Sequence, residues 1–126
     1  MNRSTPSVGI LSFFFAKETQ LKKESKFQAD LIRDLKIMLP GCLVLKNDPN
    51  YIQGIPDLLV LYGPQWAALE CKRSENETKR PNQDYYVGIL DKMSYSSFIY
   101  PENKKVVLHE IQQTFRPRRA ARVSKR

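Results

Sequence analysis

Two kinds of hydrophobic spacing follow one another along the chain and divide it into elements. From Leu21 to Leu39 apolar residues recur at steps of three and four, which predicts a helix with one apolar face. That face comprises Phe27, Leu31, Leu35 and Met38, with Ile32 beside it. Pro40-Gly41 ends the helix, and the apolar run from Cys42 to Lys46 then indicates a short strand.

The segment from Ile55 to Lys72 is expected to form a β-hairpin. A turn-forming stretch, Asn47 to Asn50, precedes it. Ile55 to Tyr62 and Trp66 to Lys72 are short apolar runs typical of strands, and Gly63-Pro64-Gln65 between them is typical of a turn. The pattern therefore predicts two antiparallel strands in the middle of the chain.

The register of this hairpin decides which side chains meet at its open end. Side chains alternate along a strand, so Glu70 and Cys71 lie on opposite faces. One register pairs Leu61 with Trp66. It places Asp57 directly opposite Glu70, with Cβ atoms about 5 Å apart. A register shifted by one residue would instead place Asp57 opposite Cys71.

Helical and strand patterns continue after the hairpin. Ser74 to Arg80 is a polar loop, and Pro81 opens a helix that extends to about Met93. One face of this helix carries Gln83, Tyr86, Val87 and Leu90. Ser97 to Tyr100 and Lys105 to Ile111 are expected as the last two strands, joined by a turn at Pro101-Glu102-Asn103. In order, these elements predict an α/β or α+β fold, of which we take α/β, with a mixed sheet of four or five strands flanked by helices.

Length and charge add a domain boundary to this picture. With 126 residues, the chain can build one domain around a single core. We assign residues 1–114 to that domain and residues 115–126 to a basic tail that we expect to be disordered. The tail has six basic residues and no acidic one, within a net charge of +8 for the whole chain. Such a tail favours a polyanionic partner, although a solubilising end is the alternative.

Several functional classes are disfavoured by what the sequence lacks. The longest apolar stretch, Val8 to Ala16, is too short to cross a bilayer, and we interpret it as a buried element. His109 is the single histidine; we expect it to be structural, which disfavours histidine-dependent nucleases and a Ser-His-Asp triad. No glycine-rich phosphate loop is present, so we expect no nucleotide cofactor. Cys42 and Cys71 fit free thiols of a cytoplasmic protein.

Candidate chemistry gathers at the open end of the hairpin. Asp57 and Glu70, if opposed, offer the hard carboxylate oxygens that bind Mg²⁺ or Mn²⁺. Such a cation polarises a phosphoryl oxygen and lowers the pKa of bound water, as phosphodiester hydrolysis requires. Lys72 follows on the same face as Glu70, where it can stabilise charge that develops on the phosphate. The three residues together predict metal-dependent cleavage of a phosphodiester.

These residues resemble the signature of the PD-(D/E)XK nuclease superfamily. Ile55-Pro56-Asp57, twelve residues and then Glu70-Cys71-Lys72 have the order and spacing of that motif. Gly54-Ile55-Pro56-Asp57-Leu58 with a Glu-x-Lys strand is similar to the VRR-NUC branch, which includes phage and bacterial junction-cleaving nucleases. The resemblance implies site roles for Glu24 in the first helix, as a further metal ligand, and for Gln83 in the helix after the Glu-x-Lys strand.

One submotif of related nucleases is not matched. RecB-like nucleases carry Gln-x-x-x-Tyr in the helix that follows the Glu-x-Lys strand. Here the tyrosines that follow Gln83 are Tyr85 and Tyr86, at offsets of two and three. The chain therefore departs from the RecB-like pattern at this position.

The resemblance implies a restriction-endonuclease-like core and an Mg²⁺-dependent DNA endonuclease, in which Mn²⁺ substitutes. We expect structure-selective cleavage of branched DNA, such as a Holliday junction, in a bacterial or phage-infected cell. Because one site cuts one strand, a homodimer is expected to act on a two-fold related junction. A sequence-specific homing or restriction-type endonuclease on the same core is one alternative. A non-catalytic DNA-binding module on a nuclease fold is another.

Contacts to DNA are expected from basic and aromatic residues around the motif. The candidates are Lys46, Tyr51, Lys79 and Arg80, together with Arg116, Arg118 and Arg119 of the basic tail. The lysines and arginines would neutralise phosphates. A packing role for Tyr51 and a solvated surface for the basic residues are the competing interpretations.

Overall fold

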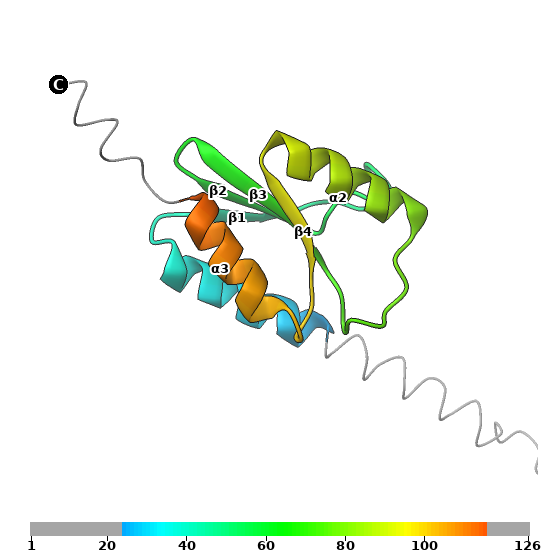
Figure 1. The fold of residues 1–126 in the computed structure, drawn as a ribbon, viewed down its shortest axis with the longest axis horizontal. Helices are drawn as coiled ribbons and strands as arrows, with labels where there is room; N and C mark the ends of the chain where they lie inside the picture. Colours follow the sequence, from blue (N-terminus) through cyan, green and yellow to red (C-terminus); the bar gives the residue numbers. More distant parts are fainter. Residues whose placement is uncertain (1–23, 116–126) are drawn as a thin grey trace, which may run out of the picture.

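The computed structural model describes residues 24–115 of the chain. A helix over residues 24–38 comes first. The elements that follow it are β1 (Leu43–Lys46), β2 (Leu58–Tyr62), β3 (Gln65–Cys71), α2 (Pro81–Met93), β4 (Tyr95–Ile99) and α3 (Lys104–Thr114). The strands form one sheet in the order β1-β2-β3-β4, with two antiparallel pairings followed by a parallel one. The fold is therefore α/β, with a mixed four-stranded sheet flanked by helices (Figure 1).

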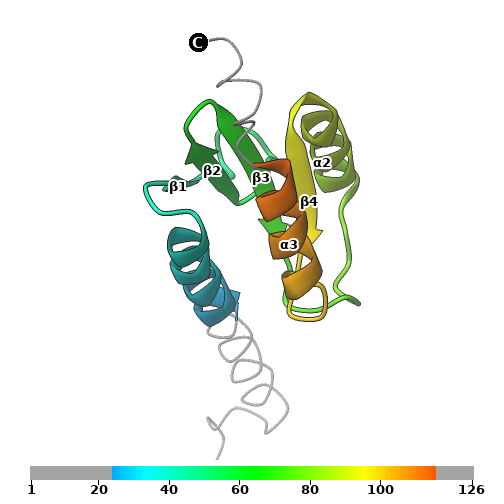
Figure 2. The same cartoon turned by 60° about the vertical axis from the view of Figure 1, so that its left-hand side comes forward.

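One face of the sheet is covered by the helix of residues 24–38 and by α3 (Figure 2). Leu31 and Leu35, four residues apart, are fully buried, as the spacing of three and four predicted. They share a core with Val60 from the sheet and with Val107 and Ile111 from α3. Apolar burial of this kind contributes about 25 cal/mol for each Å² removed from water, so this layer is the main source of stability.

The opposite face of the sheet is covered only in part. Helix α2 packs over β3 and β4, on the side of the sheet away from α3 (Figure 1). Beside it, Leu59, Leu61 and Trp66 line an apolar groove of about 680 Å³. Leu43 pairs with Leu61, so its exposed side chain belongs to the same face. The sheet thus has one face covered by two helices and one face covered by α2 only over β3 and β4.

The last predicted strand is wrong. We expected a strand from Lys105 to Ile111, but residues Lys104–Thr114 form helix α3. The adjacent valines, Val106 and Val107, favour a strand locally. Burial follows a helical period instead: Val107, Ile111 and Phe115 are buried at steps of four, while Val106 is 59% exposed. Packing of this apolar stripe against the sheet outweighs the local preference, and the sheet has four strands among the described residues.

Further sequence predictions concern the two ends of the chain. Phe115, which we assigned to the basic tail, is buried in the core, so the packed part of the chain includes it. The apolar stretch from Val8 to Ala16 and the basic residues of the tail from Arg116 onward lie outside the described residues. Between residues 24 and 115, no helix is both long and apolar enough to span a membrane.

Candidate active site

Asp57 and Glu70 meet at the open end of the hairpin. Leu61 pairs with Trp66, which is the register that places Asp57 opposite Glu70. Asp57 lies one residue before β2, and its Oδ2 accepts a hydrogen bond of 2.9 Å from the backbone N–H of Cys71. The negative charge of Asp57 raises the pKa of Glu70, as expected for neighbouring carboxyl groups. Of the two registers that the sequence left open, the structure has the one that places Asp57 opposite Glu70.

The backbone on either side of Asp57 is fastened by Asn47. The Asn47 backbone N–H donates to the Asp57 carbonyl at 2.8 Å, and its side-chain Nδ2 donates to the Pro56 carbonyl, also at 2.8 Å. Pro56 itself is buried and has no N–H that would need a partner. The start of β2 is thus fixed by contacts that do not use the Asp57 carboxylate.

Gln83 joins the acidic pair to Lys72. Its Nε2 donates to Glu70 Oε2 at 3.0 Å, and its Oε1 accepts from Lys72 Nζ at 2.7 Å. The same Oε1 accepts from the backbone N–H of Arg80 at 3.0 Å, at the start of α2. Gln83 lies in the first turn of α2 because Pro81 begins that helix, as the sequence predicted. One amide therefore fixes both Lys72 and Glu70 relative to the helix.

A clasp in the loop after β3 was not anticipated from the sequence. Glu77 Oε1 accepts from the backbone N–H of Arg73 at 2.5 Å and from Arg73 Nε at 3.3 Å. Its Oε2 lies 4.0 Å from Lys72 Nζ, which also donates to the Thr78 carbonyl at 3.1 Å. Nothing in the polar run from Ser74 to Arg80 distinguishes Glu77, because its role depends on how the loop folds back over β3.

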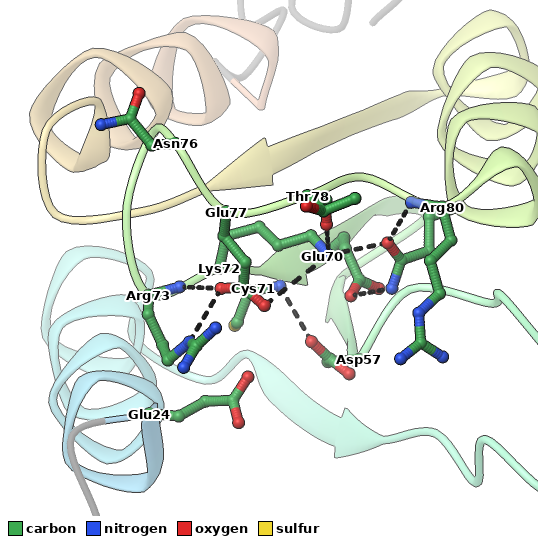
Figure 3. A pocket seen from close by; sticks show the side chains of 11 residues that line it. Glu24, Asp57, Glu70, Cys71, Lys72, Arg73, Asn76, Glu77, Thr78 and Arg80 are labelled. Carbon is green, nitrogen blue, oxygen red and sulfur yellow. Dashed lines mark hydrogen bonds and ion pairs between the residues drawn. The ribbon is translucent and has the colours of Figure 1, made fainter. Parts of the chain in front are cut away.

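Glu24 comes to the site from the first described helix. It lines the same pocket, and its carboxylate points toward Asp57 (Figure 3). Partial burial, and then the negative charges of Glu77 and Asp57, raise the pKa of Glu24 above its usual value. A raised pKa from neighbouring carboxylates places Glu24 within the electrostatic reach of the pair.

These groups line a polar pocket of about 810 Å³, which we call the charged pocket. The charged side chains that line it are Glu24, Asp57, Glu70 and Glu77 against Lys72, Arg73 and Arg80. All five residues that the sequence assigned to catalysis line this pocket. Glu70 and Lys72 are only 5% and 4% exposed, so their charges act in a poorly hydrated environment.

The pKa values of Asp57 and Glu70 are both raised in this pocket. Burial, and then the charge of Asp57, raise the pKa of Glu70 to about 8. Burial likewise raises the pKa of Asp57. The raised pKa values mean that the ionised form of each acid is disfavoured, although the charge of the neighbouring Lys72 acts in the opposite direction. A divalent cation between the two acids would favour their ionised forms.

Asp57 and Glu70 are the carboxylates of the charged pocket that could hold a metal. Among residues 24–115, no three acidic, histidine or cysteine side chains are gathered closely enough to form a complete metal site. Glu24 is therefore in the pocket without completing a three-carboxylate cage with Asp57 and Glu70. Mg²⁺ is usually held by one or two carboxylates and keeps several water or phosphate ligands. Asp57 and Glu70 fit that mode of binding.

Among residues 24–115, the predicted DNA contacts lie on different parts of the surface, and Arg80 is the one that lines the charged pocket. Arg80 lines the charged pocket, on the side of Asp57 away from Arg73 (Figure 3). Lys79 Nζ lies 4.7 Å from the centre of the Phe98 ring, which holds its ammonium group near the surface. Tyr51 is 84% exposed. Lys46 is exposed on the edge strand β1, and the three tail arginines, Arg116, Arg118 and Arg119, lie outside the described residues.

Comparison with known proteins adds no relative: no family model, curated protein or solved structure matches the chain. The resemblance to PD-(D/E)XK nucleases therefore stays an expectation carried by the motif.

His109 is exposed on α3 and does not line the charged pocket.

Proposed function

We propose that this protein is a metal-dependent endonuclease that hydrolyses phosphodiester bonds in DNA. The observation that supports it most directly is the charged pocket, where Asp57 and Glu70 meet at the open end of the hairpin and Gln83 joins Glu70 to the buried Lys72. Two carboxyl groups that line one pocket mark a position where a cation is favoured. The PD-(D/E)XK-like order of Asp57, Glu70 and Lys72 supports the same conclusion.

Each residue of the chain has a distinct task in this proposal. Asp57 and Glu70 hold Mg²⁺, or Mn²⁺ in its place, and Glu24 adds negative charge at the edge of the cation site. When bound, the cation polarises the phosphoryl oxygen and lowers the pKa of a bound water. Lys72 directs its ammonium group at the charge that develops on the phosphate. Gln83 keeps Lys72 and Glu70 in place, so little reorganisation is needed during the reaction.

We propose branched DNA as the substrate and a homodimer as the active form. The chain presents one such pocket among its described residues, and cutting two strands at a junction requires two. Arg80 and Lys79 neutralise phosphates beside the site, and Tyr51 stacks on a base or sugar. Lys46 and the tail residues Arg116, Arg118 and Arg119 extend this contact along the duplex.

The test is cleavage of labelled linear, flap, splayed and four-way DNA, with Mg²⁺, with Mn²⁺ and with EDTA. Wild-type protein should cut the branched substrates only with the metal. Lys72→Met should lose cleavage and keep binding, whereas Lys105→Met, an exposed lysine on α3, should leave cleavage unchanged. Sedimentation of the DNA-free protein measures the dimer.

Two outcomes would favour the alternatives. Cleavage at one sequence of linear duplex, with no preference for branches, would favour a sequence-specific endonuclease. Tight DNA binding without cleavage under any metal condition would favour a non-catalytic binding module.

A further inference from the structure

A second pocket adjoins the charged pocket and shares its floor. It has a volume of about 450 Å³. Its lining consists of Pro49, Asn50, Gln53, Gly54, Ile55, Asp57, Glu70, Arg80, Pro81, Asn82 and Gln83. Asp57 and Glu70 line both pockets, so whatever occupies the second lies beside the proposed cation site. We call it the amide pocket, for its three carboxamide side chains other than Gln83.

These three carboxamides differ from the other amides near the site. The side chains of Asn50, Gln53 and Asn82 are exposed and make no hydrogen bond to another described residue. Asn47 and Gln83, by contrast, are both committed to holding the walls of the site. Each amide of the pocket therefore keeps a donor and an acceptor for a ligand.

The two walls of the amide pocket are held against each other. Gly54 has φ +92°, and a Cβ there would lie 2.4 Å from Asn82 Cβ and 2.9 Å from the Asn82 carbonyl carbon. Only glycine permits this approach of the loop to the first turn of α2. The loop that carries Asn50 and Gln53 is thus pinned against the helix that carries Asn82, so the pocket has a fixed width.

The chemistry of the lining selects a neutral, planar ligand with hydrogen-bonding edges. The floor is acidic and Arg80 is the one cation that lines the pocket, so a second phosphate is poorly accommodated beside Asp57 and Glu70. Asparagine and glutamine pair bidentately with the edges of nucleobases. Pro49, Ile55 and Pro81 add apolar surface for the faces of a ring.

We propose that the amide pocket receives the base of an unpaired nucleotide next to the scissile phosphate. This inference rests on the proposed nuclease function and specifies its substrate. A base within a duplex is stacked on both sides and its pairing edge is already occupied, so it can enter a recess only after it is flipped out of the stack, which costs free energy. A splayed or displaced nucleotide can enter at little cost. The pocket thus supplies a physical reason for a preference for branched DNA.

The test compares a forked DNA with copies in which one unpaired position at a time is abasic. For the wild-type protein, one abasic position beside the cut bond should lower kcat/KM by about fivefold or more. Gln53→Ala with Asn50→Ala should cut the intact fork more slowly and lose this discrimination. Gln112→Ala, an exposed glutamine on α3, is the matched control.

Two results separate failure of this inference from failure of the proposed function. In the first, the double variant keeps the wild-type ratio of kcat/KM between the intact and the abasic fork while Glu70→Gln abolishes cleavage. In that case the pocket does not hold the base and the nuclease proposal stands. If no DNA is cut, the fluorescence of forks that carry 2-aminopurine at one unpaired position at a time still tests whether the pocket holds a base. A fluorescence change at one position that disappears in the double variant supports the pocket, and an unaltered change overturns it.

Discussion

The acidic pair of Asp57 and Glu70 has two very different sides. On the charged side, Lys72 already has Gln83 and the Thr78 carbonyl as partners, and Glu77 is clasped to Arg73. On the amide side, the three carboxamides of the pocket make no hydrogen bond to another described residue. The charged groups are oriented in advance, whereas the neutral groups remain available.

This difference fits a division between chemistry and recognition. Groups that stabilise a transition state act best when they need no reorganisation, which favours fixed partners. Groups that recognise a substrate gain most when their hydrogen bonds form only with the ligand, because an unsuitable ligand then leaves them unpaired. The predictions that follow test each side separately.

The largest effect is expected from neutralising the acidic pair. Glu70→Gln keeps the shape of the side chain and removes one ligand charge, so single-turnover cleavage with saturating Mg²⁺ should fall by about a thousandfold or more. DNA binding should change little, since phosphate contacts lie elsewhere. A loss of less than tenfold would mean that the charged side does not carry the chemistry.

The next largest effect concerns the wall between the loop and α2. Gly54→Ala should lower the free energy of unfolding by about 3 kcal/mol, because it adds a clash with Asn82 to the strain of a positive φ. Gly63→Ala is the matched control: its φ is +60° and a Cβ there meets nothing within 4 Å, so only about 1 kcal/mol is expected. Urea unfolding measures both, and equal losses would argue against close packing at Gly54.

The metal-free protein should become less stable as pH rises. The folded-state pKa of Glu70 is about 8, above its ordinary value of 4.5, so the folded chain binds more protons than the unfolded chain between these limits. The stability that this group contributes is therefore fully present below pH 4.5 and is lost progressively as the pH rises towards 8. Thermal melts from pH 5 to 8 test this.

Two further melts show whether that pH dependence belongs to the acidic pair. Glu70→Gln should flatten the slope, because the amide does not titrate. Added Mg²⁺ should stabilise the wild-type protein more at pH 8 than at pH 5, since cation binding requires ionised ligands. A slope that persists in Glu70→Gln would assign the effect to other groups.

A smaller effect is expected at Gln83. Gln83→Ala removes the acceptor for Lys72 and the donor to Glu70 without touching either charge, so cleavage should fall by about tenfold. Apparent Mg²⁺ affinity should weaken by a similar factor. If Gln83→Glu restores neither, the contribution of Gln83 depends on its amide bridging both groups; full rescue by glutamate would mean that only the contact to Lys72 matters.

Local patterns were enough to predict the acidic pair and its neighbours. The tight turn at Gly63-Pro64 fixes the hairpin register, and the register fixes which residue opposes Glu70. Pro81 fixes the start of α2 and with it the first-turn position of Gln83. These features depend on residues close together in the chain, so the sequence reduced the hairpin to two registers and placed Gln83 in the first turn of α2.

Features that depend on distant packing were missed. The valines of α3 favour a strand locally, and only burial against the sheet reveals the helical stripe of Val107 and Ile111. The Glu77 clasp and the approach of Gly54 to Asn82 both require a loop to fold against another element. No local spacing encodes such contacts.

The buried thiol of Cys71 can report on the opening of β3, the strand that carries Glu70. Cys71 lies between Glu70 and Lys72, is 2% exposed, and has a thiol pKa raised by burial. It should resist alkylation until β3 separates from its neighbours, because only an exposed thiolate reacts readily. In a Cys42→Ala background, the rate of Cys71 alkylation therefore measures how often β3 opens. A bound cation or bound DNA should lower this rate.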